Sequence, residues 1–318
     1  MKYIEKQFAP PEPGALRRKA VPKWVPMTAI RRSMDRELPQ LRRMMGAKSK
    51  DVTLRPVLMQ DHIIDGRSKN IRVRRYFPAA PSAPRKGVLF FHGGGFFGGT
   101  ITAVEEYCKA LSDRADCVVI SVEYHLAPEF PYPEGIEDCY CALKWAWAHA
   151  DALGIDRARM AVNGDSAGGN FSAVIAQWAL RDGEIALMAQ VLIYPLVDFT
   201  RGISPIVGHG MDRPATIVTH WYTGDGVDLA DPNLSPIRAA SLAGLPPALI
   251  AVAERDALCA QGSEYAEALS DAGVDSTLIL YKNTNHGFID HTGVLDQGLD
   301  LAQEVAGFLE SVTRHAKT

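Results

Sequence analysis

The sequence predicts an α/β protein built on a mostly parallel central sheet, with helices on both faces and a helical cap. Two observations support this prediction. Short apolar runs alternate with helical stretches along most of the chain, which is the pattern of strand–helix–strand units in a parallel sheet. Residues 198–238 break this rhythm, with many Gly, Pro and Asp residues and no clear strand. Such an insertion in a regular fold is typical of a lid.

The expected elements follow in chain order. Residues 52–59 and 71–76 are predicted to form a leading pair of strands, with a turn at Asp65-Gly66. Further strands are predicted at 88–91, 117–122, 159–164, 189–196, 247–253 and 276–282, and helices at 103–115, 134–153, 167–182, 261–272 and 293–313.

These elements divide the chain into an α/β domain and a cap. Residues 51–197 and 239–318 are expected to form the α/β domain, and 1–50 and 198–238 the two parts of the cap. The first fifty residues hold thirteen Lys/Arg and four Asp/Glu, a balance that could also indicate an arm for nucleic acid or membranes. Eight apolar residues between Trp24 and Met45 fall close to helical spacing. This spacing favours an amphipathic segment docked on the body.

Composition narrows the class of protein. The chain has 318 residues, of which 47% are hydrophobic and 22% charged, as in a soluble globular enzyme. No apolar run approaches the roughly 18 residues of a membrane span, and the N-terminus has no apolar signal core. Five cysteines without zinc or disulfide spacing predict reduced thiols. We therefore expect a cytoplasmic enzyme without a metal or other cofactor, stable membrane insertion or nucleic-acid partner.

The stretch FFHGGGFFGG, residues 90–99, contains five glycines at an expected strand-to-helix turn. Exposed backbone N–H groups in such a turn can bind a phosphate or an oxyanion. The phosphate interpretation rests on Gly93, Gly95 and Gly98, which match G-x-G-x-x-G spacing, and on Glu123 at the end of the next strand. That pattern is weak evidence when taken alone.

The segment NGDSAGGN, residues 163–170, contains the pattern G-x-S-x-G around Ser166. This pattern follows a predicted strand and opens a predicted helix. The turn between the two elements is so sharp that only small neighbours fit beside the serine. One interpretation is structural: a turn of small residues with a serine that caps the helix. The other is catalytic: a nucleophilic serine whose Oγ projects from the sheet.

A nucleophilic serine needs a base, and the base needs a carboxylate to orient it. His286 follows a predicted strand, and His291 is the runner-up. Glu254 and Asp256 compete for the acid. Glu254 directly ends a strand and is expected to brace the loop, so Asp256 is favoured, with Asp198 as the distant alternative. A catalytic set of Ser166, Asp256 and His286 would also explain why the loop at residues 90–99 is rich in glycine. Backbone N–H groups of the glycine-rich loop and of Ala167 would then meet an oxyanion, and the phosphate interpretation leaves all three residues unexplained.

Five ordered motifs resemble the hormone-sensitive-lipase-like esterases, bacterial family IV of the α/β-hydrolases. The motifs are FHGGGF (91–96), YHLAPEFPYP (124–133), NGDSAGGN (163–170), AERDAL (253–258) and NHGF (285–288). The resemblance implies an α/β-hydrolase fold and a carboxylesterase with Ser166 as nucleophile, His286 as base and Asp256 as its partner. It also implies oxyanion N–H groups at Gly94 and Gly95, and a cap made from the N-terminal segment and the insertion.

The substrate is the least defined part of the prediction. Five aromatic residues are expected at the mouth of the site, although Phe97 and Trp221 could instead pack the core and the lid. The five are Phe96, Phe97, Trp221, Tyr222 and Phe288. Such rings predict a small-molecule ester with a short- to medium-chain acyl group. An amidase, formamidase or lactonase shares every motif, a non-catalytic binding protein is the remaining alternative, and a homodimer is possible.

Overall fold

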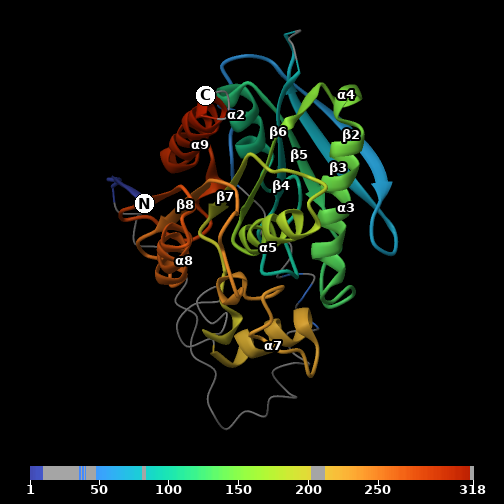
Figure 1. Ribbon diagram of the computed structural model, residues 1–318, viewed down its shortest axis with the longest axis vertical. Coiled ribbons are helices and arrows are strands. Elements are labelled where there is room, and N and C mark those ends of the chain that lie inside the picture. Colours follow the sequence, from blue (N-terminus) through green and yellow to red (C-terminus); the bar gives the residue numbers. More distant parts are fainter. Residues whose placement is uncertain are drawn as a thin grey trace.

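The computed structural model describes residues 1–9, 36, 38, 40, 48–80, 84–201 and 212–315. Among these residues, one sheet has the strand order β1-β9-β8-β7-β6-β4-β5-β3-β2 (Figure 1). Antiparallel pairing is confined to β2–β3 and β3–β5, so the predicted, mostly parallel sheet is confirmed. The strands are β1 Lys2–Lys6, β2 Val57–Asp65, β3 Asn70–Pro78, β4 Arg85–Phe91, β5 Cys117–Glu123, β6 Ile155–Asp165, β7 Ala189–Ile193, β8 Ala248–Ala253 and β9 Ser276–Tyr281.

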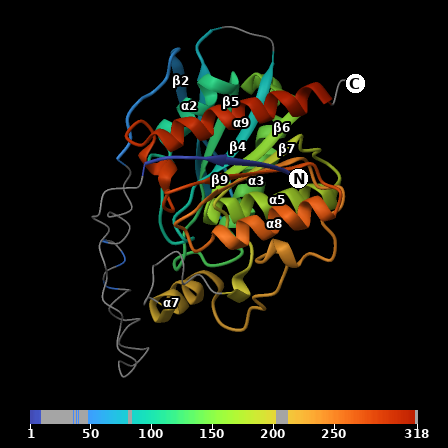
Figure 2. The same cartoon turned by 90° about the vertical axis from the view of Figure 1, so that its left-hand side faces the viewer.

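Helices cover both faces of the sheet, as predicted (Figures 1 and 2). On one face α2 (Glu105–Ala115) packs with α9 (Asp296–His315), and α3 (Glu134–Ala148), α5 (Ala167–Asp182) and α8 (Cys259–Asp271) lie on the other. The central strands are buried on both faces, which is why they are continuous apolar runs. The remaining helical elements are α4 Ala150–Leu153, α7 Asp212–Thr223, η1 Phe199–Arg201, η2 Pro236–Arg238 and η3 Phe288–His291.

The leading strands differ from their predicted bounds. The first runs over Val57–Asp65 and not over 52–59. Pro56 has no N–H for a ladder, and the backbone N–H of Leu54 is already taken by the Asp113 carboxylate at 2.7 Å. The predicted turn after Asp65 is present, closed by a hydrogen bond from Gly66 N to the carbonyl of Lys69 at 3.0 Å. Apolar periodicity predicted that this pair of strands exists, but it did not predict where the first strand begins.

The N-terminal strand β1 is an element that the sequence did not predict. It pairs in parallel with β9 and forms one edge of the sheet, so assigning these five residues to a cap is wrong. The side chain of Lys6 forms ion pairs with Asp300 at 3.2 Å and with Glu304, both on α9. A short edge strand with charged side chains carries little apolar signal. The cap prediction for residues 10–47 lies almost wholly outside the described residues.

The insertion between β7 and β8 contains α7, which lies below the sheet in both views (Figures 1 and 2). Residues 202–211 lie outside the described part of the chain. The connection back to the body is held by Asn170 of α5, whose amide donates to the carbonyls of Leu196 at 2.8 Å and Leu234 at 2.7 Å. Both ends of the insertion are therefore tied to the first turns of α5. Its assignment as part of a cap stays a prediction.

Candidate active site

Ser166 lies at the sharp turn between β6 and α5, with φ of 54°. A Cβ on Gly164 would lie 2.2 Å from the carbonyl oxygen of Gly168, and a Cβ on Gly168 would lie 1.9 Å from that of Phe91. Backbone atoms cannot move aside as a flexible side chain can, so neither position has room for a larger residue. The main chain of this turn is further fixed by a hydrogen bond from Ser166 N to the Ile193 carbonyl at 2.8 Å.

A continuous hydrogen-bond chain joins Ser166, His286 and Asp256. The distance from Ser166 Oγ to His286 Nε2 is 2.9 Å, and from His286 Nδ1 to Asp256 Oδ2 it is 2.6 Å. The other oxygen of Asp256 accepts from the N–H of Leu258 at 2.9 Å. With Nδ1–H donating to the carboxylate, Nε2 is left to accept the serine hydroxyl. This arrangement can activate an alcohol as a nucleophile and stabilise the imidazolium that results.

The other carboxylates considered from sequence have different partners. Glu254 accepts from the backbone N–H of Asn283 at 2.7 Å and pairs with Lys282. The N–H of Asn283 and then Lys282 lower the pKa of the Glu254 carboxyl. Asp198 forms an ion pair with Arg238 at 3.0 Å. The structure thus places Asp256 against the histidine and Glu254 in the brace of its loop.

The runner-up from the sequence, His291, does not meet Ser166. His291 lies at the end of η3 and makes no hydrogen bond to the serine. His220, on α7, pairs with Asp225 at 2.9 Å. His209 lies outside the described residues. Among the histidines that the structure describes, His286 is the one hydrogen-bonded to the serine.

The glycine-rich loop packs directly on the serine turn. Its first glycine, Gly93, donates its N–H to Asp165 Oδ1 at 2.7 Å. Gly94 and Gly95 have φ of 127° and 62°, and the carbonyl of Gly94 accepts from Gly98 N at 2.9 Å. Among the described residues, no protein acceptor is hydrogen-bonded to the N–H groups of Gly94, Gly95 and Ala167. These three donors are therefore available to an anionic oxygen.

His92 braces this loop from below. Its imidazole stacks on Tyr124 with ring centroids 4.2 Å apart, and its Nδ1 donates to the carbonyl of Gly93 at 2.8 Å. The Tyr124 hydroxyl in turn donates to the His92 carbonyl at 2.7 Å. Burial lowers the pKa of His92 to about 4, so the ring is neutral at pH 7. These contacts make His92 a structural support of the glycine-rich loop.

Tyr194 is a buried residue at the site that was not predicted from the sequence. The Tyr194 ring lies 4.5 Å from the His286 ring, and its hydroxyl lies 3.5 Å from Asp165 Oδ2. Burial raises the pKa of Asp165 to about 6 and that of Asp290 well above its usual range. Asp165 could have been found from its place beside the serine and the glycine loop. No local signal marks Tyr194, because its contacts join distant parts of the chain.

Four of the five predicted aromatic residues form one cluster between the glycine loop and α7. Phe96 stacks on Tyr222 with centroids 4.0 Å apart, and Phe97 meets Trp221 edge-on at 5.5 Å. All four side chains are buried. The fifth, Phe288, packs elsewhere, against Tyr194 and Tyr281 on the opposite face of the sheet. Their roles toward a substrate stay predictions.

Phe288 nevertheless borders the site from another side. With His286 it lines a cavity of about 470 Å³, which Phe8 also borders. The other lining residues come mainly from the histidine loop and the start of α9. This cavity gives the imidazole an approach that does not pass through the aromatic cluster.

A group of metal-ligating type occurs in the described part of the chain at His125, Glu134 and Asp138, whose ligand atoms lie within 4.8 Å of one another. Asp138 already accepts from His125 Nδ1 at 2.7 Å and from Arg67 N at 2.7 Å, and Glu134 faces the Arg67 guanidinium at 3.5 Å. The protein itself satisfies these carboxylates. The phosphate interpretation rests partly on Glu123, and the carboxylate of this residue is already paired with Arg72 at 2.7 Å.

The chain is similar to known esterases. A family model for the α/β hydrolase fold matches residues 88–290. The esterase LipI of Mycobacterium tuberculosis is 39% identical over 247 residues, which are 74% of this chain and 76% of LipI. The carboxylesterase NlhH of the same organism is 39% identical over 233 residues, or 70% of this chain and 72% of NlhH. A solved hyperthermophilic esterase from the archaeon Pyrobaculum calidifontis superposes with a TM-score of 0.75 at 33% identity, covering 91% of this chain and 94% of the other.

Proposed function

The chain belongs to the hormone-sensitive-lipase-like branch of the α/β-hydrolases and is a carboxylesterase, and we propose that it cleaves short- to medium-chain acyl esters through an acyl-enzyme on Ser166. The observation that best supports this mechanism is the hydrogen-bond chain of 2.9 Å and 2.6 Å through His286. It gives the serine a base, and the base an orienting carboxylate, on a rigid turn.

In the proposed first half-reaction, Ser166 Oγ attacks the ester carbonyl carbon and His286 Nε2 takes the hydroxyl proton. The tetrahedral oxyanion accepts hydrogen bonds from the N–H groups of Gly94, Gly95 and Ala167. Its collapse expels the alkoxide, which takes the proton back from the imidazolium and leaves as the alcohol. Asp256 stabilises the imidazolium throughout. Water, deprotonated by His286, then attacks the acyl-enzyme, and the carboxylic acid leaves as Ser166 is regenerated.

The proposed acyl range is about two to eight carbons, as the family resemblance implies. Bulky side chains gather beside the glycine loop, with Phe96 and Tyr222 stacked at 4.0 Å. In an apolar pocket one methylene changes transition-state binding by only about 1–3 kcal/mol, so preference should decline by degrees and not end abruptly. A panel of p-nitrophenyl esters from acetate to palmitate, with the matching anilides, measures this range. A maximum at long chains would contradict the proposed range, and faster anilide cleavage would indicate an amidase.

The proposed nucleophile is tested by Ser166→Ala. Because nucleophile, base and acid act as a unit, turnover of a short-chain ester should fall by about 10⁴-fold or more while the fold survives. The far-ultraviolet circular dichroism spectrum and the melting temperature serve as controls. A pure, folded variant with near-normal turnover would refute the mechanism.

We also propose a cytoplasmic location and a homodimer for this protein. No helix in the described residues is long and apolar enough to cross a bilayer. We keep the cytoplasm and a homodimer as predictions. Cell fractionation tests the compartment, and light scattering after size-exclusion chromatography distinguishes a dimer from a monomer of 34.7 kDa.

A further inference from the structure

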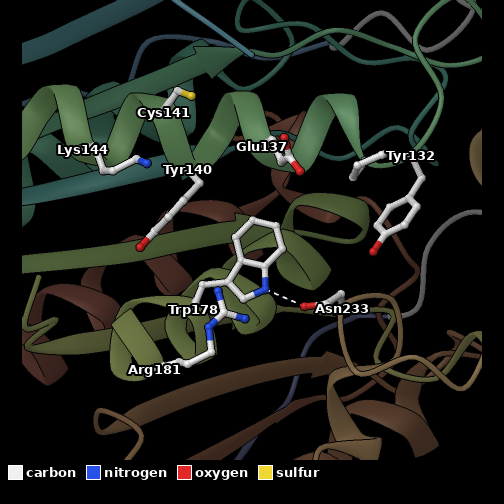
Figure 3. A pocket seen from close by; sticks show the side chains of 9 residues that line it. Tyr132, Glu137, Tyr140, Cys141, Lys144, Trp178, Arg181 and Asn233 are labelled. Atoms are coloured by element: carbon white, nitrogen blue, oxygen red, sulfur yellow. Dashed lines mark hydrogen bonds between the residues drawn. The ribbon is translucent and has the colours of Figure 1, made fainter. Parts of the chain in front are cut away.

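A second cleft lies away from Ser166, between α3 and α5 (Figure 3). It has a volume of about 410 Å³. Its walls come from α3, from the last two turns of α5 and from the segment that returns from α7 to the sheet. None of the residues that line this α3–α5 cleft takes part in the proposed reaction. Its chemistry is therefore a separate question.

Aromatic rings form two walls of the cleft. Trp178 and Tyr140 meet edge to face, with centroids 5.4 Å apart and planes at 78° (Figure 3). Their polar tips are occupied, since the indole N–H donates to Asn233 at 2.6 Å and the Tyr140 hydroxyl to Asp182 at 2.7 Å. What remains for a ligand is a corner of two ring surfaces. A planar ring fits such a corner, because it can stack on one wall and present its edge to the other.

The charge at this corner is positive. The Lys144 ammonium lies 4.7 Å from the centre of the Tyr140 ring, and the Arg181 guanidinium lies 6.0 Å from that of Trp178. Among the described residues, no carboxylate lies within ion-pair distance of Lys144, and Arg181 shares only Asp182, at 3.0 Å. The acidic lining residue, Glu137, is already paired with Arg67 at 2.9 Å. The cleft therefore offers two cations beside an aromatic corner, with Asp182 shared between Arg181 and the Tyr140 hydroxyl.

We propose that the α3–α5 cleft is a second ligand site, which binds small aromatic carboxylates. The ring of the ligand packs against the corner formed by Trp178 and Tyr140, and its carboxylate pairs with Lys144 and Arg181. Charge-assisted hydrogen bonds make the site selective for a carboxylate over a neutral group. Packing against the rings makes it selective for an aromatic acid over an aliphatic one.

A ligand at this site would also touch the anchor of α7. Tyr132, at the rim of the cleft, donates its backbone N–H to the carbonyl of Tyr222 at 2.6 Å, and the two rings meet edge-on at 5.8 Å. Tyr222 in turn stacks on Phe96 of the glycine loop. The proposed site thus borders the segment that connects α7 to the catalytic rim, without reaching Ser166.

Isothermal titration calorimetry with benzoate on the full chain tests the proposal, with benzamide as the neutral probe of the same shape. Benzoate should bind saturably and at least about tenfold more tightly than benzamide, since hydrogen bonds to a charged group are stronger than those between neutral groups. Lys144→Gln should weaken benzoate binding by about tenfold, whereas Lys144→Arg should largely preserve it. Trp178→Ala should abolish saturable binding.

Two controls separate this site from the catalytic one. Lys69 also lies over an aromatic ring, 4.6 Å from the centre of Phe130, but outside the cleft, so Lys69→Gln should leave benzoate affinity unchanged. Enzyme whose Ser166 carries a diethylphosphoryl group should bind benzoate as the free enzyme does. The proposal is overturned by the absence of saturable binding, by equal affinity for benzamide, by equal loss in both lysine variants, or by loss of binding on phosphorylation.

Discussion

Two regions that meet at the catalytic rim are built in different ways. The serine turn, residues 163–170, is shaped by backbone against backbone: a Cβ on Gly168 would lie 1.9 Å from the Phe91 carbonyl oxygen. The histidine loop, residues 282–288, is held by side chains from elsewhere. Glu254 binds its backbone at Asn283 and pairs with Lys282, and Tyr194 packs on the imidazole at 4.5 Å.

The difference shows which kind of contact holds each catalytic group in position. A turn limited by main-chain contacts tolerates no added atom, and its requirement for small residues is local. A loop limited by side chains can lose one contact and keep the others. We therefore expect substitutions that add a side chain at the glycines of the serine turn to damage fold and reaction together. Changes around the histidine loop should separate the two, according to whether they affect the imidazole or its supports.

Among changes to the contacts of the histidine loop, the largest effect should come from Asp256→Asn. The amide removes the charge that stabilises the imidazolium and can hold the ring in the wrong tautomer, so kcat should fall about 10³–10⁴-fold. The Asp256 side chain is only 1% exposed, and its second oxygen accepts from Leu258 N. The asparagine can still accept that bond, and the fold should survive. Steady-state kinetics with a short-chain ester measures the loss, and a folded variant within tenfold of wild type would contradict the assignment.

In the serine turn, Gly168→Ala should affect stability and rate together. The new methyl group forces the Phe91 carbonyl and the glycine loop away from the turn, at a cost of about 3 kcal/mol or more in the free energy of unfolding. Displaced oxyanion donors should also lower kcat by about 10²-fold. Gly307→Ala on α9 is the matched control. Nothing lies within 4 Å of its new Cβ, so stability should stay equal or rise. Equal behaviour of the two variants would refute the backbone argument.

Within the serine turn, Asp165 accepts from Gly93 N and faces Tyr194, the residue that supports the histidine loop. Its pKa is raised from 3.8 to about 6 by burial, so its contribution to stability is present below pH 4 and is lost as pH rises through 6. Asp165→Asn keeps an acceptor for Gly93 but cannot ionise. Relative to wild type, the variant should gain about 2–3 kcal/mol of unfolding free energy between pH 4 and pH 7. Urea titrations across that range measure the difference, and a difference that does not change with pH would contradict it.

The smallest effect should come from Glu254→Gln. Glutamine can still accept from Asn283 N, and the exposed ion pair with Lys282 is screened by solvent and contributes little to stability. We expect less than about a threefold change in kcat, with a slightly lower melting temperature. A loss comparable to that of Asp256→Asn would mean that the loop support and the orienting acid had been wrongly distinguished.

The same contrast explains how much of the molecule the sequence could predict. Apolar runs at strand spacing located the central strands, and the small residues around Ser166 located its turn, because both signals are local. The strand Lys2–Lys6 was missed, since a polar edge strand has no such periodicity. The start of the first antiparallel strand was misplaced, because its limit depends on Pro56 and on a distant carboxylate, Asp113.

Within the site, the G-x-S-x-G turn, the chain order and the positions after predicted strands predicted that Ser166, Asp256 and His286 come together, and the structure gives them the expected hydrogen bonds. The support by Tyr194 could not be predicted, because it depends on which side chain a neighbouring strand places behind the ring. Phe288 was grouped with four aromatic residues from which it is separate, since sequence distance from His286 does not say on which face of the sheet a ring will pack.

The central claim, that ester cleavage passes through a covalent intermediate on Ser166, is tested most directly by mass spectrometry after reaction with a diethyl p-nitrophenyl phosphate probe. We expect one diethylphosphoryl group per chain, located on Ser166, with activity lost in proportion to labelling. We also expect folded Asp256→Asn and Ser166→Ala proteins to react far more slowly or not at all. Complete inactivation with the label on another residue, or full labelling with activity retained, would contradict the claim.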